Sequence, residues 1–122
     1  MFQETRMRSF RAPVALAIAM SFCGLSAMAA ELPTIALSLK AHRFTPPTFS
    51  VPAGQKVRVI LVNLDGATEE FDSHDLKVEE LVTPHGRSSF TIGPLKPGAY
   101  NFMGEFHPDT AQGRVIAVEP DR

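Results

Sequence analysis

Cysteine is scarce in this sequence: its 122 residues include only one, and tryptophan is absent. The single cysteine, Cys23, falls in an apolar stretch near the N-terminus, so residues 30–122 contain no thiol. This absence excludes disulfide bonds, cysteine-based zinc sites and thiol chemistry from that part of the chain. A Gly-rich phosphate-binding loop is also missing. Ser73-His74-Asp75 has the residue types of a hydrolase triad, but adjacent residues on a strand cannot converge as a triad must.

The N-terminal residues have the pattern of an export signal. A basic segment, an apolar run too short for a comfortable membrane span, and an A-x-A cleavage pattern follow one another: Arg6 to Arg11, Ala12–Ser26 and Ala27-Met28-Ala29. We therefore expect residues 1–29 to be a cleaved signal peptide and residues 30–122 to form one exported domain. A retained anchor helix is the alternative interpretation.

Positive charge is also scarce in the expected domain. Removal of residues 1–29 takes away three arginines and one glutamate, which changes the formal net charge from −1 to about −3. A domain with this charge is not expected to bind nucleic acid. Without disulfides, its stability must come from a hydrophobic core that buries roughly 60–70% of the unfolded surface.

Short segments with a period of two, separated by Pro- and Gly-containing turns, predict strands. The expected strands cover residues 34–40, 43–45, 49–51, 56–64, 70–73, 88–92, 99–106 and 114–119. Residues 74–82 fit one or two helical turns as well as a loop and a strand. We expect residues 88–92 and 99–106 to pair around the Pro97-Gly98 turn. Seven or eight short strands with little helix predict an all-β fold, an antiparallel Greek-key β-sandwich.

Residues 92–113 organise the second half of the chain. Tyr100 follows the Pro97-Gly98 turn at the start of a late strand, a position typical of the tyrosine corner of Greek-key sandwiches. Along this strand the aromatic residues Tyr100, Phe102 and Phe106 alternate with Asn101, Met103, Glu105 and His107, which predicts one aromatic and one polar face. The strand then leads into a loop opened by His107-Pro108, where a sandwich can display ligands.

The order of these motifs resembles that of cupredoxins. The segment Leu-x-Pro-Gly-x-Tyr-x-Phe at residues 95–102, followed by His107-Pro108, is similar to the last third of such proteins. Residues 44–54 and 57–63 are similar to the F-x-P, V-x-A-G and V-x-L-x-N opening of the family. The resemblance covers most of the expected domain, and it implies a Greek-key sandwich with a ligand-bearing loop end.

The copper ligands of that family are only partly present. In copper-carrying members a Cys follows the Phe by two residues, a His comes three residues later, and a Met often follows. The same count here gives Gly104, His107, and Ala111 or Gln112. The His expected six residues after the Asn is replaced by Glu69. Type 1 copper needs a thiolate, so the sequence excludes that site and its electron transfer.

The acidic motifs resemble the cupredoxin-like subunits of bacterial periplasmic iron uptake, the Ftr-type ferrous importers and the cupredoxin domain of Efe-type proteins. These motifs are Glu-Glu-Phe-Asp-Ser at residues 69–73, ahead of Leu76, and Glu-Phe-His at residues 105–107. The resemblance implies a periplasmic protein that binds or oxidises iron. It also implies partners: a membrane iron permease and other periplasmic uptake components.

Carboxylates and imidazoles therefore stand where the copper proteins have sulfur. Such ligands suit Fe(II), Fe(III), Mn(II) or Cu(II) better than Cu(I). Glu69 and Glu70 point to opposite faces of a strand, so only one can reach the site; the count from Asn63 favours Glu69 and the iron-family pattern favours Glu70. His42 and His85 lack neighbours at ligand spacing and are interpreted as surface residues. The candidate metal ligands are Glu69, Glu70, His74, Met103, Glu105 and His107, with Asp72 nearby.

These observations leave three hypotheses for function. The first is a periplasmic protein that binds iron, or a copper ion that helps to oxidise it, for a ferrous importer. The second is a periplasmic copper carrier that uses His107, Met103 and a second histidine. The third is a cupredoxin-shaped interaction module without a metal. Enzymatic activity is conceivable only as a metal-dependent oxidase half-reaction, and the sequence does not require one.

Overall fold

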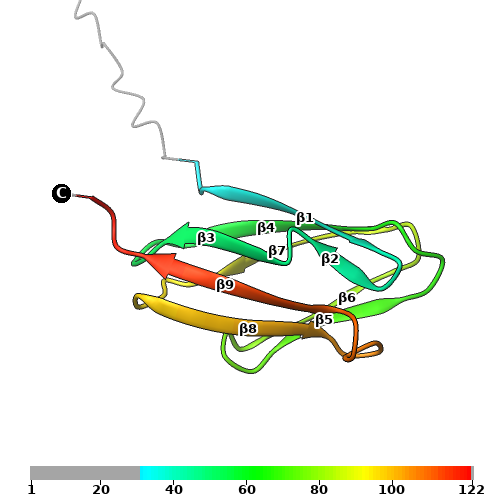
Figure 1. Ribbon diagram of the computed structural model, residues 1–122. Coiled ribbons are helices and arrows are strands. Elements are labelled where there is room, and N and C mark those ends of the chain that lie inside the picture. The colour runs from blue at the N-terminus through cyan, green and yellow to red at the C-terminus, as the bar shows by residue number, and fades with distance from the viewer. Residues whose placement is uncertain (1–30, 122) are drawn as a thin grey trace, which may run out of the picture.

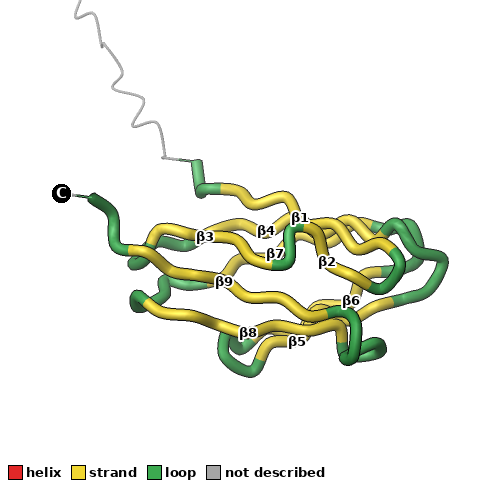
Figure 2. Tube along the Cα trace, in the orientation of Figure 1, coloured by secondary structure: helices red, strands yellow, loops and turns green. Residues whose placement is uncertain are grey.

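The computed structural model describes residues 31–121, so the expected signal peptide lies outside the described residues. Residues 31–121 fold into nine strands joined by turns and loops (Figure 2). The strands are β1 (Thr34–Lys40), β2 (Arg43–Thr45), β3 (Thr48–Pro52), β4 (Val57–Asn63), β5 (Glu69–Ser73), β6 (Val78–Val82), β7 (Arg87–Ile92), β8 (Gly98–Gly104) and β9 (Gln112–Val118). This described part of the chain holds no helix that is long and apolar enough to cross a membrane.

The strands form two sheets that pack face to face (Figure 1). One sheet has four strands in the order β2-β1-β4-β7, and the other has five in the order β3-β9-β8-β5-β6. The predicted all-β sandwich is confirmed. The ambiguous residues 74–82 form a turn followed by β6, because Val78–Val82 completes the edge of the five-stranded sheet.

Both sheets are mixed rather than wholly antiparallel. β1 pairs with β4 in parallel, with Leu39 opposite Asn63, and β3 pairs with β9 in parallel. The chain leaves the four-stranded sheet after β2, enters the other sheet as β3, and returns as β4. It therefore enters the first sheet twice from the same end, and the C-terminal ends of β1 and β4 lie together.

The prediction that residues 88–92 and 99–106 form a hairpin is wrong. β7 pairs with β4, whereas β8 pairs with β9 and β5 in the opposite sheet. The connection contains Pro94 and Pro97, which lack the N–H that a strand ladder requires, and it crosses between the sheets. The tyrosine corner is confirmed, because the Tyr100 hydroxyl donates a hydrogen bond of 2.7 Å to the Lys96 carbonyl.

The core lies between the sheets around a cluster of aromatic rings. Phe71 is fully buried, and its ring stacks on Phe102 with a centroid distance of 4.8 Å. Phe44 meets both of these rings edge-on, at 6.0 Å from Phe71 and 5.1 Å from Phe102. Since Phe44 follows the turn after β1 and Phe71 lies two residues after the start of β5, this cluster fixes the distance between the two segments that carry the site described below.

Replacing Phe71 with alanine tests the importance of this cluster. Loss of the buried ring should lower the free energy of unfolding by about 3–5 kcal/mol, measured by urea denaturation. Phe106 is the control, because its side chain is 49% exposed. Phe106→Ala should cost about 1 kcal/mol or less. Equal losses in the two variants would contradict the assignment of Phe71 to the core.

Candidate metal centre

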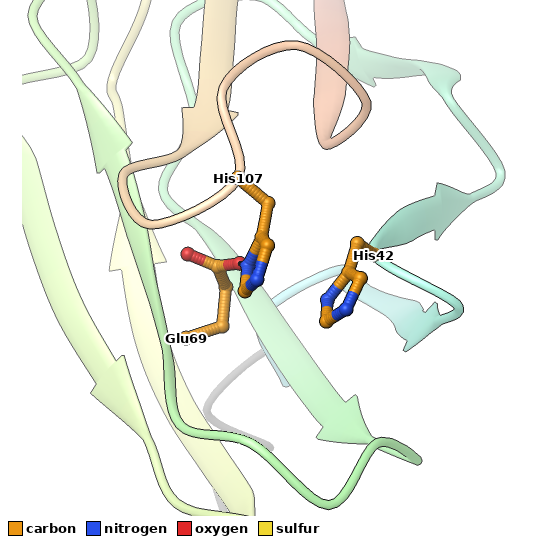
Figure 3. Close-up of side chains that lie close together, drawn as sticks. All are labelled: His42, Glu69 and His107. Carbon is orange, nitrogen blue, oxygen red and sulfur yellow. Dashed lines mark hydrogen bonds and ion pairs between the residues drawn. The ribbon is translucent and has the colours of Figure 1, made fainter.

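Three side chains from distant parts of the sequence meet at one end of the sandwich (Figure 3). His42 comes from the turn between β1 and β2, Glu69 begins β5, and His107 lies in the loop between β8 and β9. One ligand atom from each residue lies within 4.8 Å of the others. Among the histidine, aspartate and glutamate residues of the described part of the chain, these three lie close enough together to contact one ion.

The topology explains this convergence. Because β1 and β4 are parallel, the turn after β1 and the loop after β4 occupy the same end of the molecule. β5 begins at that end, and β8 runs towards it before the chain turns into residues 105–111. The first and last described residues lie at the opposite end (Figure 1). The three side chains are therefore placed by the ends of different strands rather than by a local motif.

Glu69 is the buried member of the group, with 1% of its surface exposed. Its Oε1 accepts hydrogen bonds from the backbone N–H of Glu70 at 3.0 Å and of Phe106 at 2.8 Å. Its Oε2 lies 2.6 Å from His107 Nδ1. A carboxylate removed from water requires such partners, and these three contacts fix the orientation of its oxygens.

Gly104 provides the space for this carboxylate. A Cβ atom at Gly104 would lie 2.7 Å from Glu69 Cδ and 2.9 Å from Glu69 Oε2, closer than real side chains pack. Gly104 is the residue at the position that the cupredoxin count assigns to the copper-binding Cys. Glycine therefore stands in place of the Cys at position 104, and glutamate in place of the His at position 69. The two replacements fit one another, because the absence of a side chain at Gly104 leaves room for the Glu69 carboxylate.

His42 is presented by a strained turn. Ala41 and His42 both adopt left-handed backbone conformations, with φ of 50° and 55°. Such conformations cost roughly 1–2 kcal/mol per residue that is not glycine. The His42 ring stacks on His107 with a centroid distance of 3.6 Å and an interplanar angle of 15°. Its ring face therefore borders the pair formed by Glu69 and His107.

Asp65 lies beneath this turn and accepts hydrogen bonds from its backbone. Its Oδ1 is 2.7 Å from the Ala41 nitrogen, and its Oδ2 is 2.9 Å from the His42 nitrogen. The hydrogen bond from His42 holds the pKa of Asp65 below its ordinary value of 3.8. Asp65 therefore keeps a negative charge close to the site across the neutral pH range.

The structure brings Glu69 and His107 together, but the other four predicted ligands lie elsewhere. Glu70 points to the opposite face of β5 from Glu69 and is half-buried. Met103 is 41% exposed on the outer face of the five-stranded sheet. His74 is exposed in the turn after β5, at the other end of that strand from Glu69.

Glu105 belongs to an acidic group on the outer face of the five-stranded sheet. A side-chain hydrogen bond with Asp72, together with the negative charges of Asp72, Glu70 and Glu79, raises the pKa of the Glu105 carboxyl. Asp72 is also the residue opposite Met103 in the β5–β8 pair. Met103 and Glu105 thus share a surface with other acidic residues, on the far side of β5 from the Glu69 side chain.

His42 is more than the ordinary surface residue that the sequence suggested. Its side chain is 40% exposed, but it stacks on His107 and completes the group with Glu69. Spacing along the sequence could not reveal this, because 27 positions separate His42 from Glu69 and a larger gap separates it from His107. A usable signal was the position of His42 in the two-residue turn between two predicted strands, provided that the parallel pairing of β1 with β4 was recognised.

Two imidazoles and one carboxylate form a ligand set with well-defined preferences. Such a set with open positions is typical of non-haem Fe(II) sites, and imidazole and carboxylate also accommodate Cu(II), Zn(II) and Mn(II). No thiolate or thioether belongs to the group of His42, Glu69 and His107. These residues therefore do not fit a type 1 copper site, which requires a cysteine sulfur.

Comparison with known proteins places the chain in a family. Residues 13–117 match the cupredoxin-like domain family, so the chain belongs to that family. An uncharacterised protein of Rickettsia prowazekii (strain Madrid E) is 45% identical over 82 residues, which cover 67% of this chain and 66% of that protein. The match thus spans slightly less than two thirds of the relative's length.

Solved structures share the fold at low sequence identity. The metal-binding domain of the Cu(I)-exporting P-type ATPase CopA from Streptococcus pneumoniae D39 has a TM-score of 0.63 and 12% identity, covering 70% of this chain and 85% of that domain. Auracyanin A, a blue copper protein from Chloroflexus aurantiacus, has a TM-score of 0.60 and 14% identity, covering 70% and 98%. Amicyanin from Paracoccus versutus has a TM-score of 0.54 and 18% identity, covering 73% and 83%.

The fit between Gly104 and Glu69 can be tested by a double-mutant cycle. Gly104→Ala should lower the free energy of unfolding by about 1–3 kcal/mol, because the added methyl group would collide with the Glu69 carboxylate and with the Ala111 Cβ atom. In a Glu69→Ala background the same substitution should cost at least about 0.5 kcal/mol less. Thermal or urea unfolding measures both values.

Gly66→Ala is the matched control for this cycle. A Cβ atom at Gly66 would meet only His85 Nε2, at 3.8 Å, so the substitution should change stability by less than about 0.5 kcal/mol. The prediction is contradicted if Gly104→Ala lowers the free energy of unfolding equally in the wild-type and Glu69→Ala backgrounds. In that case the Glu69 carboxylate does not depend on the space left at Gly104.

Proposed function

We propose that this protein is a metal-binding component of a bacterial iron uptake system. It would bind iron, or a copper ion that helps to oxidise iron, through His42, Glu69 and His107. The observation that carries the proposal is the buried Glu69 carboxylate, which is held by three hydrogen-bonding contacts beside two stacked histidines. Hard carboxylate oxygen combined with two imidazoles favours Fe(II) and Cu(II) over Cu(I).

The chemistry of the residues at the site follows from this arrangement. Glu69 and His107 would hold the metal ion in place of the hydrogen bond that joins Glu69 Oε2 to His107 Nδ1 across 2.6 Å. His42 and His107 keep 40% and 31% of their side-chain surface exposed, so an ion can enter and leave from solvent. A site that is rigid on the Glu69 side and open on the histidine side suits a protein that passes its ion on to a partner.

The cellular role is proposed from the sequence motifs. The export signal pattern in residues 1–29 supports a location in the periplasm, and the acidic motifs similar to those of Ftr- and Efe-type proteins support a role beside an iron permease. The partners would be that membrane permease and other periplasmic uptake components. After cleavage of the signal the protein would carry no membrane span.

The alternative of a copper carrier would use Met103 as a soft ligand. Met103 lies opposite Asp72 on the outer face of the five-stranded sheet, whereas the imidazoles of His42 and His107 lie at the end of the sandwich. The geometry therefore favours the carboxylate–histidine site. In the second alternative, an interaction module without a metal, the three side chains would bind no ion.

Calorimetric titration of residues 30–122 with Fe(II), Mn(II) and Cu(II), and with Cu(I) under reducing conditions, tests the proposal. Fe(II) or Cu(II) should bind with a dissociation constant of about 1 μM or tighter. His42→Ala, Glu69→Gln and His107→Ala should each weaken binding at least about 10-fold, because each removes one ligand. None of these substitutions changes a residue of the hydrophobic core, and far-UV circular dichroism verifies that each variant folds.

His74→Ala and Met103→Leu are the matched controls, since they replace predicted ligands that lie outside the group. Both should leave the affinity for Fe(II) and Cu(II) unchanged. Binding weaker than about 1 mM for every ion would contradict a metal-binding function, and a loss confined to Met103→Leu would favour the copper carrier. In cells, Glu69→Gln should reduce iron accumulation, and unchanged accumulation would contradict the role in uptake.

A further inference from the structure

Asp65 makes an unusual set of contacts with the turn that carries His42. Its two carboxylate oxygens accept hydrogen bonds from two successive backbone N–H groups, those of Ala41 and His42, at 2.7 and 2.9 Å. Its Oδ2 also lies 3.6 Å from His42 Nδ1, which is an electrostatic contact rather than a hydrogen bond. One side chain thus contacts the backbone of both central residues of the turn and the ring of one of them.

The turn requires such support because of its sequence. Tight two-residue turns with positive φ at both central positions strongly prefer Asn-Gly, Asp-Gly or Gly-Gly. Here the two residues are Ala41 and His42, and both adopt the left-handed conformation. Histidine is found there more often than most residues, but alanine is not, and neither is one of the residues that this turn prefers. The turn therefore depends on contacts from outside its own sequence, and the Asp65 carboxylate supplies two of them.

Asp65 is itself firmly placed. Its backbone N–H donates a hydrogen bond of 3.0 Å to Asn63 Oδ1, and its carbonyl accepts one of 3.0 Å from the His85 N–H. Asn63 is fully buried, and its amide nitrogen donates to the carbonyls of Ala67 and Thr83. The loop after β4 is thus fixed to the core, and it can hold the adjacent turn in one position.

We propose that Asp65 is a positioning residue for the metal site: it holds the backbone of the β1–β2 turn so that the His42 ring lies against His107 and beside Glu69. The metal-binding aspect of this inference rests on the proposed function. The placement of the ring does not, because it concerns the protein without metal. Asp65 acts through His42 and is not expected to contact the ion.

Nuclear magnetic resonance of metal-free residues 30–122 tests the placement directly. The rings of His42 and His107 are stacked at 3.6 Å, so their ring protons should give nuclear Overhauser cross-peaks in the wild-type protein. Asp65→Ala should abolish these cross-peaks, and Asp65→Asn, which retains one acceptor oxygen, should weaken them. Cross-peaks of unchanged intensity in Asp65→Ala would overturn the proposal. If that variant fails to fold, unchanged cross-peaks in Asp65→Asn would do the same.

Asp75→Ala is the matched control. Asp75 Oδ2 also accepts a backbone hydrogen bond, from Asn101 at 2.9 Å, but it lies away from the three-residue group. This variant should retain the cross-peaks between His42 and His107. Their loss in Asp75→Ala as well would show that any broken side-chain-to-backbone contact disturbs the site, and it would overturn the specific role of Asp65.

Titration with Cu(II) distinguishes positioning from general support of the fold. Asp65→Ala should weaken Cu(II) binding about 10–100-fold in the wild-type background and have no further effect in a His42→Ala background. An additional loss in the His42→Ala background would overturn the proposal that Asp65 acts through His42. If the wild-type protein binds no metal but the cross-peaks change as expected, the proposed function fails and the positioning role of Asp65 stands.

Discussion

The hydrogen-bonded pair of Glu69 and His107 is the interaction on which the site depends. A carboxylate that is 1% exposed in a sandwich without disulfide bonds is tolerated only when its oxygens are fully paired. Two backbone N–H groups and one imidazole provide that pairing, and Gly104 leaves the necessary room. The cupredoxin framework thus accommodates a buried carboxylate next to the position at which copper proteins of the family carry sulfur.

The remaining features of the site follow from the strand order. Parallel pairing of β1 with β4 places the β1–β2 turn and the β4–β5 loop side by side, so that Asp65 can contact the backbone of His42. The loop after β8 then brings His107 against both Glu69 and His42. Rigid strands fix the buried carboxylate, whereas the two histidines lie on loops at the surface. In the proposed metal site, this division would combine a fixed ligand with access for an incoming ion.

The sequence predicts much of this structure, but only where local pattern determines it. Period-two alternation predicted the sandwich, the turn before Tyr100 predicted the tyrosine corner, and family spacing indicated Glu69 and His107. The same alternation placed His107 on one face with Met103 and Glu105. That prediction failed for His107, because β8 ends at Gly104 and the chain then forms a turn in which the period of two no longer holds. Two features could not be predicted in this way: the proximity of His42 to the other two side chains and the pairing of β7 with β4. Both depend on which strands are neighbours in the sheets, and alternation along one strand carries no information on that.

The central claim is that one ion binds between the carboxylate and the two imidazoles. Crystals of residues 30–122 grown with Fe(II) and measured at the iron absorption edge test it most directly, through an anomalous difference map. The account predicts a single peak within bonding distance of His42, Glu69 and His107. A peak on the outer face beside Met103 and Asp72, or no peak at all in iron-saturated crystals, would contradict it.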